Sequence, residues 1–385
     1  MKKNVLFVVD ERQMGGVSIL LSDILKNINV SKYNIDILVL QNNGNELSNL
    51  PKGVNIIYGN KFFRGVDYTI KQAIKSFNPV LIYSKLRLVY LMRNKKIGER
   101  IKKERKKILK KKYDVEIAFK DGFCALVTIY GDSNKKYHWL HSDYSMFDPT
   151  SHYNELFSEI LPKFDKIIAI SKSVATKFKE VYPVNNVDVI YNIIDKDKII
   201  KMSNEEDIEF DKNKINFVSV GRFHEMKGYD RLIEALNKLN IDKKLDNVTV
   251  RLIGDGDQFE LVKNKVMEYN LSDKVLLLGR KSNPYVYVKK ADCFIMCSRY
   301  EPFGLVTLEA MILKVPVLSL DVLSIREIFK DSYGEIFPND EKGLYDGILD
   351  VINNQKKWKK YQSNLKDYNY DIKGIITKIE KLLDQ

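Results

Sequence analysis

The sequence alternates, from one end to the other, between short runs of β-branched or aromatic residues and longer amphipathic stretches. This alternation is typical of parallel sheets wrapped by helices, because parallel strands need a crossover connection that is usually helical. It therefore predicts an α/β fold. In the first half we expect strands at residues 5–9, 35–40, 54–58, 80–83, 115–119, 137–140, 166–170 and 187–190. In the second half we expect them at 215–220, 248–253, 275–278, 293–296, 315–318 and 335–337.

The length of 385 residues exceeds what a single hydrophobic core usually supports, so we expect two domains. Residues 192–214 are rich in Asp, Glu, Lys and Asn, which is typical of a linker with one short helix. The sequence thus predicts one Rossmann-like domain at 1–192 and a second from 193 onward. Helices are expected at 17–28 and 172–181, and from Tyr229, Asp257, Leu305 and Glu341 onward.

No apolar run approaches the roughly 18–20 residues that a membrane-spanning helix requires. The basic start of the chain is followed by an apolar run that stops at Asp10 without a small-residue cleavage site, so we expect no signal peptide. Three cysteines, Cys124, Cys293 and Cys297, are too few for a disulfide scaffold. These features predict a cytoplasmic protein with free, buried thiols.

The net charge of +13 is concentrated in one segment. Residues 93–112, from Arg93 to Lys112, hold twelve Lys or Arg against two Glu, a net of +10 (12 − 2). Ile97, Ile101 and Ile108 fall on one face of a helix there, as in helices that lie on anionic lipid at the inner face of a membrane. The alternative is a solvated helix whose isoleucines pack on its own domain. No zinc-finger spacing or RNA-binding signature is found, so we expect no nucleic-acid partner.

A glycine pair, Gly15 and Gly16, lies between the first expected strand and the first expected helix. Backbone N–H groups and the helix dipole at such a turn can bind an anion or a sugar hydroxyl. The pair lacks the G-x-G-x-x-G spacing of dinucleotide-binding turns, and a tight turn is the simpler explanation of it in isolation.

A stronger arrangement opens the second half. The strand expected at 215–220 is followed by Gly221 and Arg222, and Lys227 comes just before the next helix. In open α/β sheets, ligands bind at the carboxyl ends of the strands. A guanidinium and an ammonium at that edge suit a diphosphate whose negative charge grows as it leaves. The alternative is a pair of surface cations near a glycine turn.

A second motif follows the strand expected at 293–296, with Glu301 in a loop and Glu309 on the next helix. Glu309 can bind a ribose hydroxyl pair, and Glu301 can face a sugar. Paired carboxylates also occur in glycosidases, but a phosphate-binding turn between them argues against that chemistry. A helix cap and a surface glutamate are the other alternative. The backbone N–H groups expected to meet phosphate at this helix start are those of Phe303, Gly304, Leu305 and Val306.

Together these motifs resemble the retaining glycosyltransferases of family 4, which have the GT-B fold. The resemblance rests on G-R-x(4)-K-G at 221–228, E-x7-E with an internal P-F-G at 301–309, and Pro316-Val317. Weaker matches occur in the family's order at 15–16, 139–143, 170–173, 191–195 and 252–256.

The resemblance implies a role for each matched side chain. Arg222 and Lys227 would hold the diphosphate of a nucleotide sugar, and Glu309 would bind its ribose. Glu301 would contact the hydroxyls of the donor sugar, and His141 would hydrogen-bond that sugar near the anomeric carbon.

The resemblance also implies a central cleft between two Rossmann-like domains and transfer with retention. The backbone from Gly304 to Val306 would meet phosphate, and the loop at Arg280 would border the base. No metal and no cofactor other than the nucleotide-sugar substrate would be required. A C-terminal helix at 372–383 would cross back, so that 366–385 completes the first domain and the second ends at 365.

The sequence departs from the family at Lys314, where a glycine usually forms a left-handed turn. Asp255-Gly-Asp257 imitates a metal-binding D-x-D motif but occupies the position of the family's G-D-G loop. We therefore expect a strained turn at Lys314 and a metal-free loop at 255–257.

These observations predict a cytoplasmic enzyme, peripheral at the membrane if the basic helix contacts lipid. It would move a hexose or N-acetylhexosamine, most simply from a UDP-sugar, to a lipid-linked or cell-envelope glycan. One alternative is another GT-B enzyme, such as a sugar-nucleotide epimerase or a phosphorylase. Another is a non-catalytic GT-B partner that recognises glycans within a transferase complex.

Overall fold

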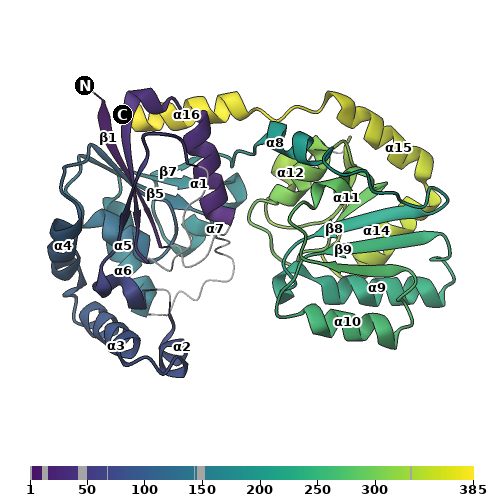
Figure 1. Ribbon diagram of the computed structural model, residues 1–385, viewed down its shortest axis with the longest axis horizontal. Helices are drawn as coiled ribbons and strands as arrows, with labels where there is room; N and C mark the ends of the chain where they lie inside the picture. Colours follow the sequence, from purple (N-terminus) through teal and green to yellow (C-terminus); the bar gives the residue numbers. More distant parts are fainter. Residues whose placement is uncertain are drawn as a thin grey trace. The chain divides into compact units, whose positions relative to one another are not determined.

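The computed structural model describes residues 2–10, 16–41, 50–66, 68–142, 144, 152–329 and 332–385. The chain forms two compact units. The first contains Met1–Ile193 and Ile372–Gln385, and the second contains Ile194–Asp371 (Figure 1).

The first unit is built on a seven-stranded parallel sheet of order β3-β2-β1-β4-β5-β6-β7. Its strands are β1 (Lys3–Val9), β2 (Tyr33–Val39), β3 (Asn55–Tyr58), β4 (Val115–Ala118), β5 (Lys135–Leu140), β6 (Lys166–Ala169) and β7 (Val187–Val189). Its α-helices are α1 (Gly16–Asn27), α2 (Ile70–Lys75), α3 (Pro79–Arg93), α4 (Ile97–Ile108), α5 (Phe123–Ile129), α6 (His152–Ile160), α7 (Lys172–Val181) and α16 (Ile372–Asp384). Short 3₁₀ helices are η1 (Val30–Lys32), η2 (Lys61–Gly65) and η4 (Leu161–Lys163).

The second unit is built on a six-stranded parallel sheet of order β10-β9-β8-β11-β12-β13. Its strands are β8 (Ile215–Val220), β9 (Val248–Ile253), β10 (Val275–Gly279), β11 (Cys293–Met296), β12 (Val317–Leu320) and β13 (Gly334–Phe337). Its α-helices are α8 (Lys196–Met202), α9 (Tyr229–Ile241), α10 (Phe259–Glu268), α11 (Tyr285–Lys289), α12 (Leu305–Ile312), α13 (Ile325–Ile328), α14 (Glu341–Asn353) and α15 (Gln355–Asn364). Short 3₁₀ helices are η5 (Glu225–Lys227) and η6 (Leu365–Asp367).

In each sheet the chain starts at an inner strand, proceeds outward on one side, and then returns to the other side of that strand. This 3-2-1-4-5-6 order is that of the Rossmann fold. It creates a crevice between the first and fourth strands, at their carboxyl ends, where loops diverge to opposite faces. In the second unit the crevice lies between β8 and β11.

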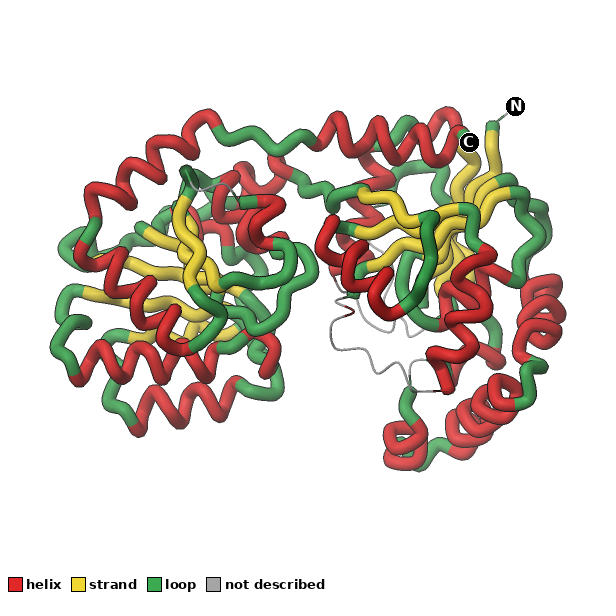
Figure 2. Tube along the Cα trace, turned by 180° about the vertical axis from the view of Figure 1, so that it is seen from behind, coloured by secondary structure: helices red, strands yellow, loops and turns green. Residues whose placement is uncertain are grey.

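Helices surround each twisted sheet (Figure 2), which is why the inner strands are mostly apolar and largely buried. Residues 5–9 of β1 are at most 1% exposed. The core of the second unit joins β8, β9 and β11 to α9 and α14 through side chains such as Phe217, Leu232 and Leu344.

The expected α/β class is confirmed, and every expected strand region except one corresponds to a strand. The exception is 80–83, which lies in helix α3. Asn78 caps this helix by accepting hydrogen bonds from the N–H groups of Val80 and Leu81, and Pro79 occupies its first turn. The prediction of a strand there was wrong because this Asn-Pro helix start outweighed the β-propensity of the apolar run.

The C-terminal helix α16 packs on the first unit. Lys3 Nζ donates to the carbonyl of Leu383, and the hydroxyl of Tyr33 donates to Asp384 Oδ1 at 2.8 Å. The backbone N–H of Asn29 donates to Glu380. These contacts confirm the expected return of the chain to its first domain.

The basic helix α4 is anchored by the face that was expected to face lipid. Ile97 and Ile101 are fully buried, and Ile108 is half-buried. Arg105 is also buried and forms an ion pair of 2.7 Å with Glu116 of β4. The isoleucine stripe therefore packs on its own domain, and Arg93 belongs to the preceding helix α3.

Within the described residues, no helix combines the length and apolar character needed to cross a membrane. Cys124, Cys293 and Cys297 are free and buried, as expected.

Candidate active site

The second unit brings two loops together at the crevice between β8 and β11. One loop runs from Gly221 to Gly228 after β8, and the other from Cys297 to Gly304 after β11. Because β8 and β11 are neighbouring parallel strands, both loops emerge at the same edge of the sheet.

The loop after β8 is fixed by a buried aromatic side chain and by glycines in the neighbouring loop. Phe223 is fully buried and stacks on Tyr229, with ring centroids 4.4 Å apart. Gly256 lies so close that a β-carbon there would sit 2.3 Å from the carbonyl oxygen of Phe223. Gly254 approaches the carbonyl of Gly221 in the same way. The glycines at 254–256 are thus needed for loop packing, which is the physical basis of that motif.

Gly228 joins the two loops. It adopts a left-handed conformation (φ +71°) before α9, and a β-carbon there would lie 2.2 Å from the carbonyl oxygen of Cys297. The thiol of Cys297 donates in turn to the carbonyl oxygen of Lys227 at 3.2 Å. Burial raises the pKa of this thiol to about 12, so it stays protonated and available as a donor.

Lys227 and Glu301 are brought into direct contact, with Lys227 Nζ 2.5 Å from Glu301 Oε2. Both side chains are partly accessible. Arg222 lies on the same loop as Lys227, is exposed, and forms no ion pair with any described residue. One cation therefore has a protein partner, and the other is available to an anion.

A partly exposed ion pair links the loop after β11 to the start of α9, which follows the loop after β8. The guanidinium of Arg299 forms two bonds of 2.6 Å with the carboxylate of Asp230 at the start of α9. The backbone N–H of Arg299 donates to the carbonyl of Met226 at 2.8 Å. Burial acts to raise the pKa of Asp230, but the hydrogen bonds and charge of Arg299 outweigh it and lower that pKa.

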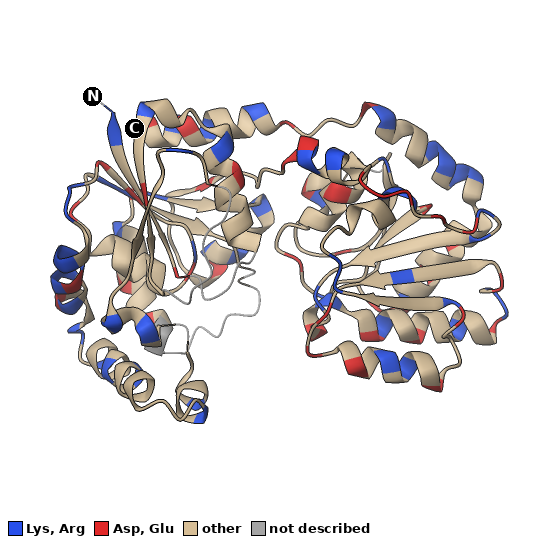
Figure 3. Cartoon of the chain, viewed as in Figure 1, with Lys and Arg blue, Asp and Glu red and all other residues tan. Residues whose placement is uncertain are grey.

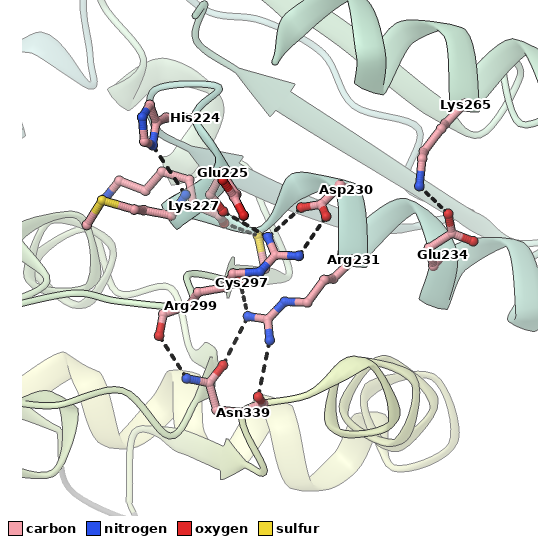
Figure 4. Close-up of polar contacts among 11 residues, drawn as sticks. His224, Glu225, Lys227, Asp230, Arg231, Glu234, Lys265, Cys297, Arg299 and Asn339 are labelled. Atoms are coloured by element: carbon pink, nitrogen blue, oxygen red, sulfur yellow. Dashed lines mark hydrogen bonds and ion pairs between the residues drawn. The ribbon is translucent and has the colours of Figure 1, made fainter. Parts of the chain in front are cut away.

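Arg231 and Asn339 complete this network, as Figure 4 shows. Arg231 donates to the carbonyl oxygen of Cys297 at 3.1 Å and to Asn339. Asn339 donates to the carbonyl of Arg299 at 3.0 Å. The loop carrying Glu301 is thus bonded on one side to the loop of Lys227 and on the other to the segment after β13.

Helix α12 begins at this edge without a side-chain cap. Gly304 at its start is left-handed (φ +86°), and no side chain caps the helix. The N–H groups of Leu305 and Val306 have no acceptor among the described residues. Such groups, together with the helix dipole, form an anion-binding position. Glu301 is not a helix cap, and Phe303 is buried.

Glu309 lies one turn into α12 and is half-buried. Burial raises its pKa to about 7, although a hydrogen bond from Tyr285 of α11 and the charge of Lys198 oppose the shift. The Tyr285 hydroxyl lies 3.1 Å from Glu309 Oε1. A carboxylate in this position can accept hydrogen bonds from a diol. Arg280, at the end of β10 on the same edge, is exposed.

His141 belongs to the first unit, at the end of β5. Its backbone N–H donates to Asp121 Oδ2 at 3.0 Å, and the hydroxyls of Ser142 and Tyr144 donate to the same carboxylate. Burial lowers the pKa of its imidazole to about 4, although the charge of Asp121 opposes this. Its Nε2 is buried and has no hydrogen-bond partner among the described residues. A neutral ring nitrogen of this kind can bond a sugar hydroxyl.

The glycine pair is described only in part, because Gly15 lies outside the described residues. Gly16 begins α1 directly after the loop that follows β1. A β-carbon at Gly16 would meet nothing within 4 Å, so packing within the described residues does not require a glycine there.

Four residues that hold the site loops or contact the predicted site residues were not expected from the sequence: Asp230, Arg299, Tyr285 and Asp121. Asp230 and Arg299 are 69 positions apart, so no local spacing could reveal their pairing. Their proximity to the matched motifs was the available signal, since Arg299 lies two residues before Glu301 and Asp230 two after Gly228.

The described residues contain no group of three or more His, Cys, Asp or Glu side chains that could hold a metal ion. Lys314 adopts the expected left-handed conformation (φ +63°) after α12.

Residues 201–370 match the family model described as "Glycosyl transferases group 1". The second unit is therefore a group 1 glycosyl transferase domain. The match covers the described site loops from Gly221 to Glu309.

Two curated relatives are each similar to about half of the chain. An uncharacterized glycosyltransferase of Methanocaldococcus jannaschii is 34% identical over 209 residues, which is 53% of this chain and 54% of the relative. The N-acetylgalactosamine-N,N'-diacetylbacillosaminyl-diphospho-undecaprenol 4-alpha-N-acetylgalactosaminyltransferase of Campylobacter jejuni is 31% identical over 216 residues, 55% of this chain and 57% of the relative. The chain thus spans about half the length of these relatives.

The complete chain resembles a solved structure, Anabaena HepE in complex with UDP and glucose. The TM-score is 0.71 with 19% identity, and the similarity covers 100% of both chains. At this identity the resemblance establishes the fold, which is GT-B. The expected fold is thereby confirmed.

Proposed function

We propose that this group 1 glycosyl transferase moves a hexose or N-acetylhexosamine from a nucleotide sugar, with UDP as the nucleotide, to a glycan acceptor. The observation that carries the proposal is the set of groups at the carboxyl edge of β8 and β11. Lys227 is held against Glu301, while Arg222 has no ion-pair partner and two helix N–H groups have no acceptor among the residues that the structure describes. These groups suit a diphosphate that leaves as an anion.

Each group has a defined part in this reaction. Arg222, Lys227 and the N–H groups of Leu305 and Val306 would bind the two phosphates. Glu309 would accept hydrogen bonds from the ribose diol. Glu301, already an acceptor for Lys227 and for the hydroxyl of Ser298, would orient the donor sugar.

We further propose transfer with retention and without a metal ion. The acceptor oxygen would attack the anomeric carbon on the face from which the diphosphate departs. The bond from that carbon to the diphosphate oxygen breaks, and the hydroxyl proton passes to the departing phosphate. The two cations would stabilise the charge that develops on the leaving group, a contribution of about 10²–10³ in rate for one such group. His141 would hydrogen-bond the donor sugar through its neutral imidazole.

A lipid-linked or cell-envelope glycan is the proposed acceptor. The name of the Campylobacter relative, which includes a diphospho-undecaprenol substrate, supports this class. The HepE complex with UDP and glucose supports UDP as the nucleotide. The proposed location is the cytoplasm, where nucleotide sugars are available.

A ligand panel tests the proposal. UDP, GDP, ADP and several UDP-sugars are added to the protein, and thermal unfolding is followed; a ligand at 100 times its Kd stabilises by about 2.7 kcal/mol. We expect stabilisation by UDP and by one UDP-sugar, and its loss in Arg222→Ala. A glycan-recognition protein without transferase activity would show no response to UDP.

Product analysis separates the remaining alternatives. With a UDP-sugar alone, a transferase releases UDP slowly and leaves the sugar unchanged apart from hydrolysis. An epimerase converts the sugar without any acceptor. A change of sugar configuration at a carbon other than the anomeric one would contradict the proposal.

A further inference from the structure

The helices α2 and α3 present an apolar surface that packs against no other part of the described chain. Seven of the fourteen large hydrophobic side chains that are exposed among the described residues lie between positions 70 and 90. They are Ile70 (41% exposed), Ile74 (54%), Phe77 (90%), Val80 (53%), Tyr83 (64%), Leu86 (52%) and Tyr90 (58%). We call these seven side chains the α2–α3 face.

Capping hydrogen bonds and buried side chains hold the two helices that carry this face in place. Thr69 and Gln72 form a reciprocal capping box at the start of α2. The opposite side of α3 is buried through Leu81, Ser84 and Leu88. Ser84 donates to the carbonyl of Phe62 in η2. The exposure is therefore a property of the folded unit.

The outward residues of α3 share one side of the helix. Val80, Tyr83, Leu86 and Tyr90 recur at spacings of three and four, which places them within one angular sector of a helix. α2 and α3 lie at the periphery of the first unit, beyond α4 (Figure 1).

Phe77 is the most unusual member. It joins α2 to α3 in a left-handed conformation (φ +51°), where glycine or asparagine is favoured and a bulky residue is an outlier. It is also 90% exposed. Neither the backbone conformation nor packing within the unit accounts for a phenylalanine at this position, so a contact outside the chain is the better reason.

The two helices that carry the face are basic, although Glu155 and Glu159 of α6 line a pocket beside α3 and Glu159 pairs with Lys95. Residues 68–98 contain seven Lys or Arg and no Asp or Glu. Lys71 and Lys75 on α2, Arg93 at the end of α3, and Lys96 just before α4 are exposed and form no ion pair with the described residues. Figure 3 shows basic but no acidic positions on these two helices.

We infer that the α2–α3 face docks on an anionic lipid surface. Aromatic and aliphatic side chains that enter the headgroup region, flanked by cations that attract acidic lipids, are the features of interfacial helices. An acidic protein could match the cations, but it offers no reason for a protruding phenylalanine at a helix junction. The inference does not depend on sugar transfer, because its readout is binding to lipid.

The sequence predicted lipid contact at residues 93–112, whereas the exposed apolar side chains lie on α2 and α3. Helix α4 has more cations, yet Ile97 and Ile101 are fully buried and Ile108 is half-buried, so its isoleucine stripe packs on its own domain and not on lipid. α2 and α3 have fewer cations but carry the exposed apolar side chains. The two segments are adjacent, so their contributions must be separated by mutation.

Vesicle flotation with the full-length protein tests the inference. Phosphatidylcholine vesicles with and without phosphatidylglycerol are compared at low salt. We expect flotation only with the anionic vesicles. Lys71→Gln with Lys75→Gln should weaken binding by roughly fivefold for each lysine. Phe77→Ser with Tyr83→Ser and Tyr90→Ser should weaken it by roughly tenfold or more.

Two matched variants serve as controls. Ile241→Ser with Leu261→Ser and Met267→Ser removes three exposed hydrophobic side chains from the second unit and should leave flotation unchanged. Lys102→Gln with Lys103→Gln and Lys106→Gln removes exposed cations of α4 and should weaken binding less than the loss of the three aromatics. Circular dichroism confirms that each variant is folded.

Three results would overturn the inference. The first is unchanged flotation of the aromatic variant. The second is a loss that occurs only in the α4 variant. The third is the absence of vesicle binding together with a concentration-dependent dimer that the aromatic variant abolishes, because the face would then be covered by a second copy of the chain.

Discussion

Both sheets have their first strand beside their fourth, and ion pairs bond across the loops at both carboxyl edges, yet the predicted site residues at the two edges differ in charge. In the second unit, charged side chains bond across the loops: Lys227 with Glu301, and Arg299 with Asp230. In the first unit an ion pair of Lys120 with Asp10 also bonds across the loops, and beside it Asp121 accepts hydrogen bonds from the His141 backbone and from two neutral hydroxyls. The imidazole of His141 is itself neutral, with a pKa of about 4.

The difference indicates that the two edges have different roles in the reaction. Charged side chains in a partly desolvated crevice cost desolvation free energy, and they are useful where a ligand carries charge. Neutral hydrogen-bonding groups discriminate among hydroxyls without attracting an anion. We therefore expect the second edge to determine nucleotide binding and the first edge to affect the transfer step.

The sharpest test compares Lys227→Ala with His141→Ala. Lys227→Ala should lower turnover by about 10²–10³, because one cation that stabilises the leaving diphosphate is lost. It should also weaken the binding of UDP. His141→Ala should lower turnover while UDP affinity stays the same. Steady-state kinetics and calorimetric titration with UDP give the two readouts.

The control for this comparison is Lys265→Ala. Lys265 pairs with Glu234 between α10 and α9, so its removal breaks a similar ion pair in the same unit (Figure 4). It should change neither readout. If His141→Ala weakened UDP binding as much as Lys227→Ala does, the proposed division between the edges would be wrong.

A second test concerns the glycines at the two edges. Gly228→Ala should lower the free energy of unfolding by about 2 kcal/mol, because alanine is disfavoured in a left-handed conformation and its β-carbon would collide with the Cys297 carbonyl. Gly16→Ala should change stability by less than about 0.5 kcal/mol, since no atom of the described residues would lie within 4 Å of the added β-carbon. Urea unfolding measures both. Equal destabilisation would show that Gly16 is a structural residue.

A third test uses pH. Glu309 has a pKa of about 7 in the free protein, and two hydrogen bonds from a ribose diol would favour its ionised form and lower that pKa. Ligand binding should then release a proton, so the affinity should fall by up to about tenfold for each pH unit below 7. UDP-glucose is the suitable probe, because its esterified diphosphate does not titrate in this range. His141, with its pKa of about 4, contributes nothing above pH 6.

Glu309→Gln provides the control for the pH test. The amide cannot titrate, so the affinity of this variant should be lower at pH 8 and independent of pH between 6 and 8. If the variant kept the slope of the natural protein, another group would be responsible, and the assignment of Glu309 to the ribose would lose its support.

Much of this architecture was accessible from the sequence because it depends on local pattern. The alternation of strands and helices determined the α/β class, and the loops around Gly221 and Gly304 carry enough unusual residues to mark a ligand-binding edge. The left-handed turn at Lys314 was implied by the family resemblance, in which a glycine usually occupies this position. These features require no knowledge of partners distant in the chain.

The errors and omissions have a common physical cause. The run at 80–83 is apolar and partly β-branched, which favours a strand, but the Asn-Pro cap before it starts a helix. Arg105 of α4 is one of twelve basic residues in its segment, and only contact with Glu116 makes it a buried structural charge. Asp230 and Arg299 became a pair only when β8 and β11 came side by side.

The sequence by itself determined which residues could carry the chemistry: the cations after β8, the glutamates around α12, and the basic character of residues 68–112. Tertiary structure decided which of these charges are buried in ion pairs, which remain available to a ligand, and which apolar faces stay uncovered. The physical reason is that burial and long-range pairing depend on which elements pack together, and a residue's own identity does not contain that information.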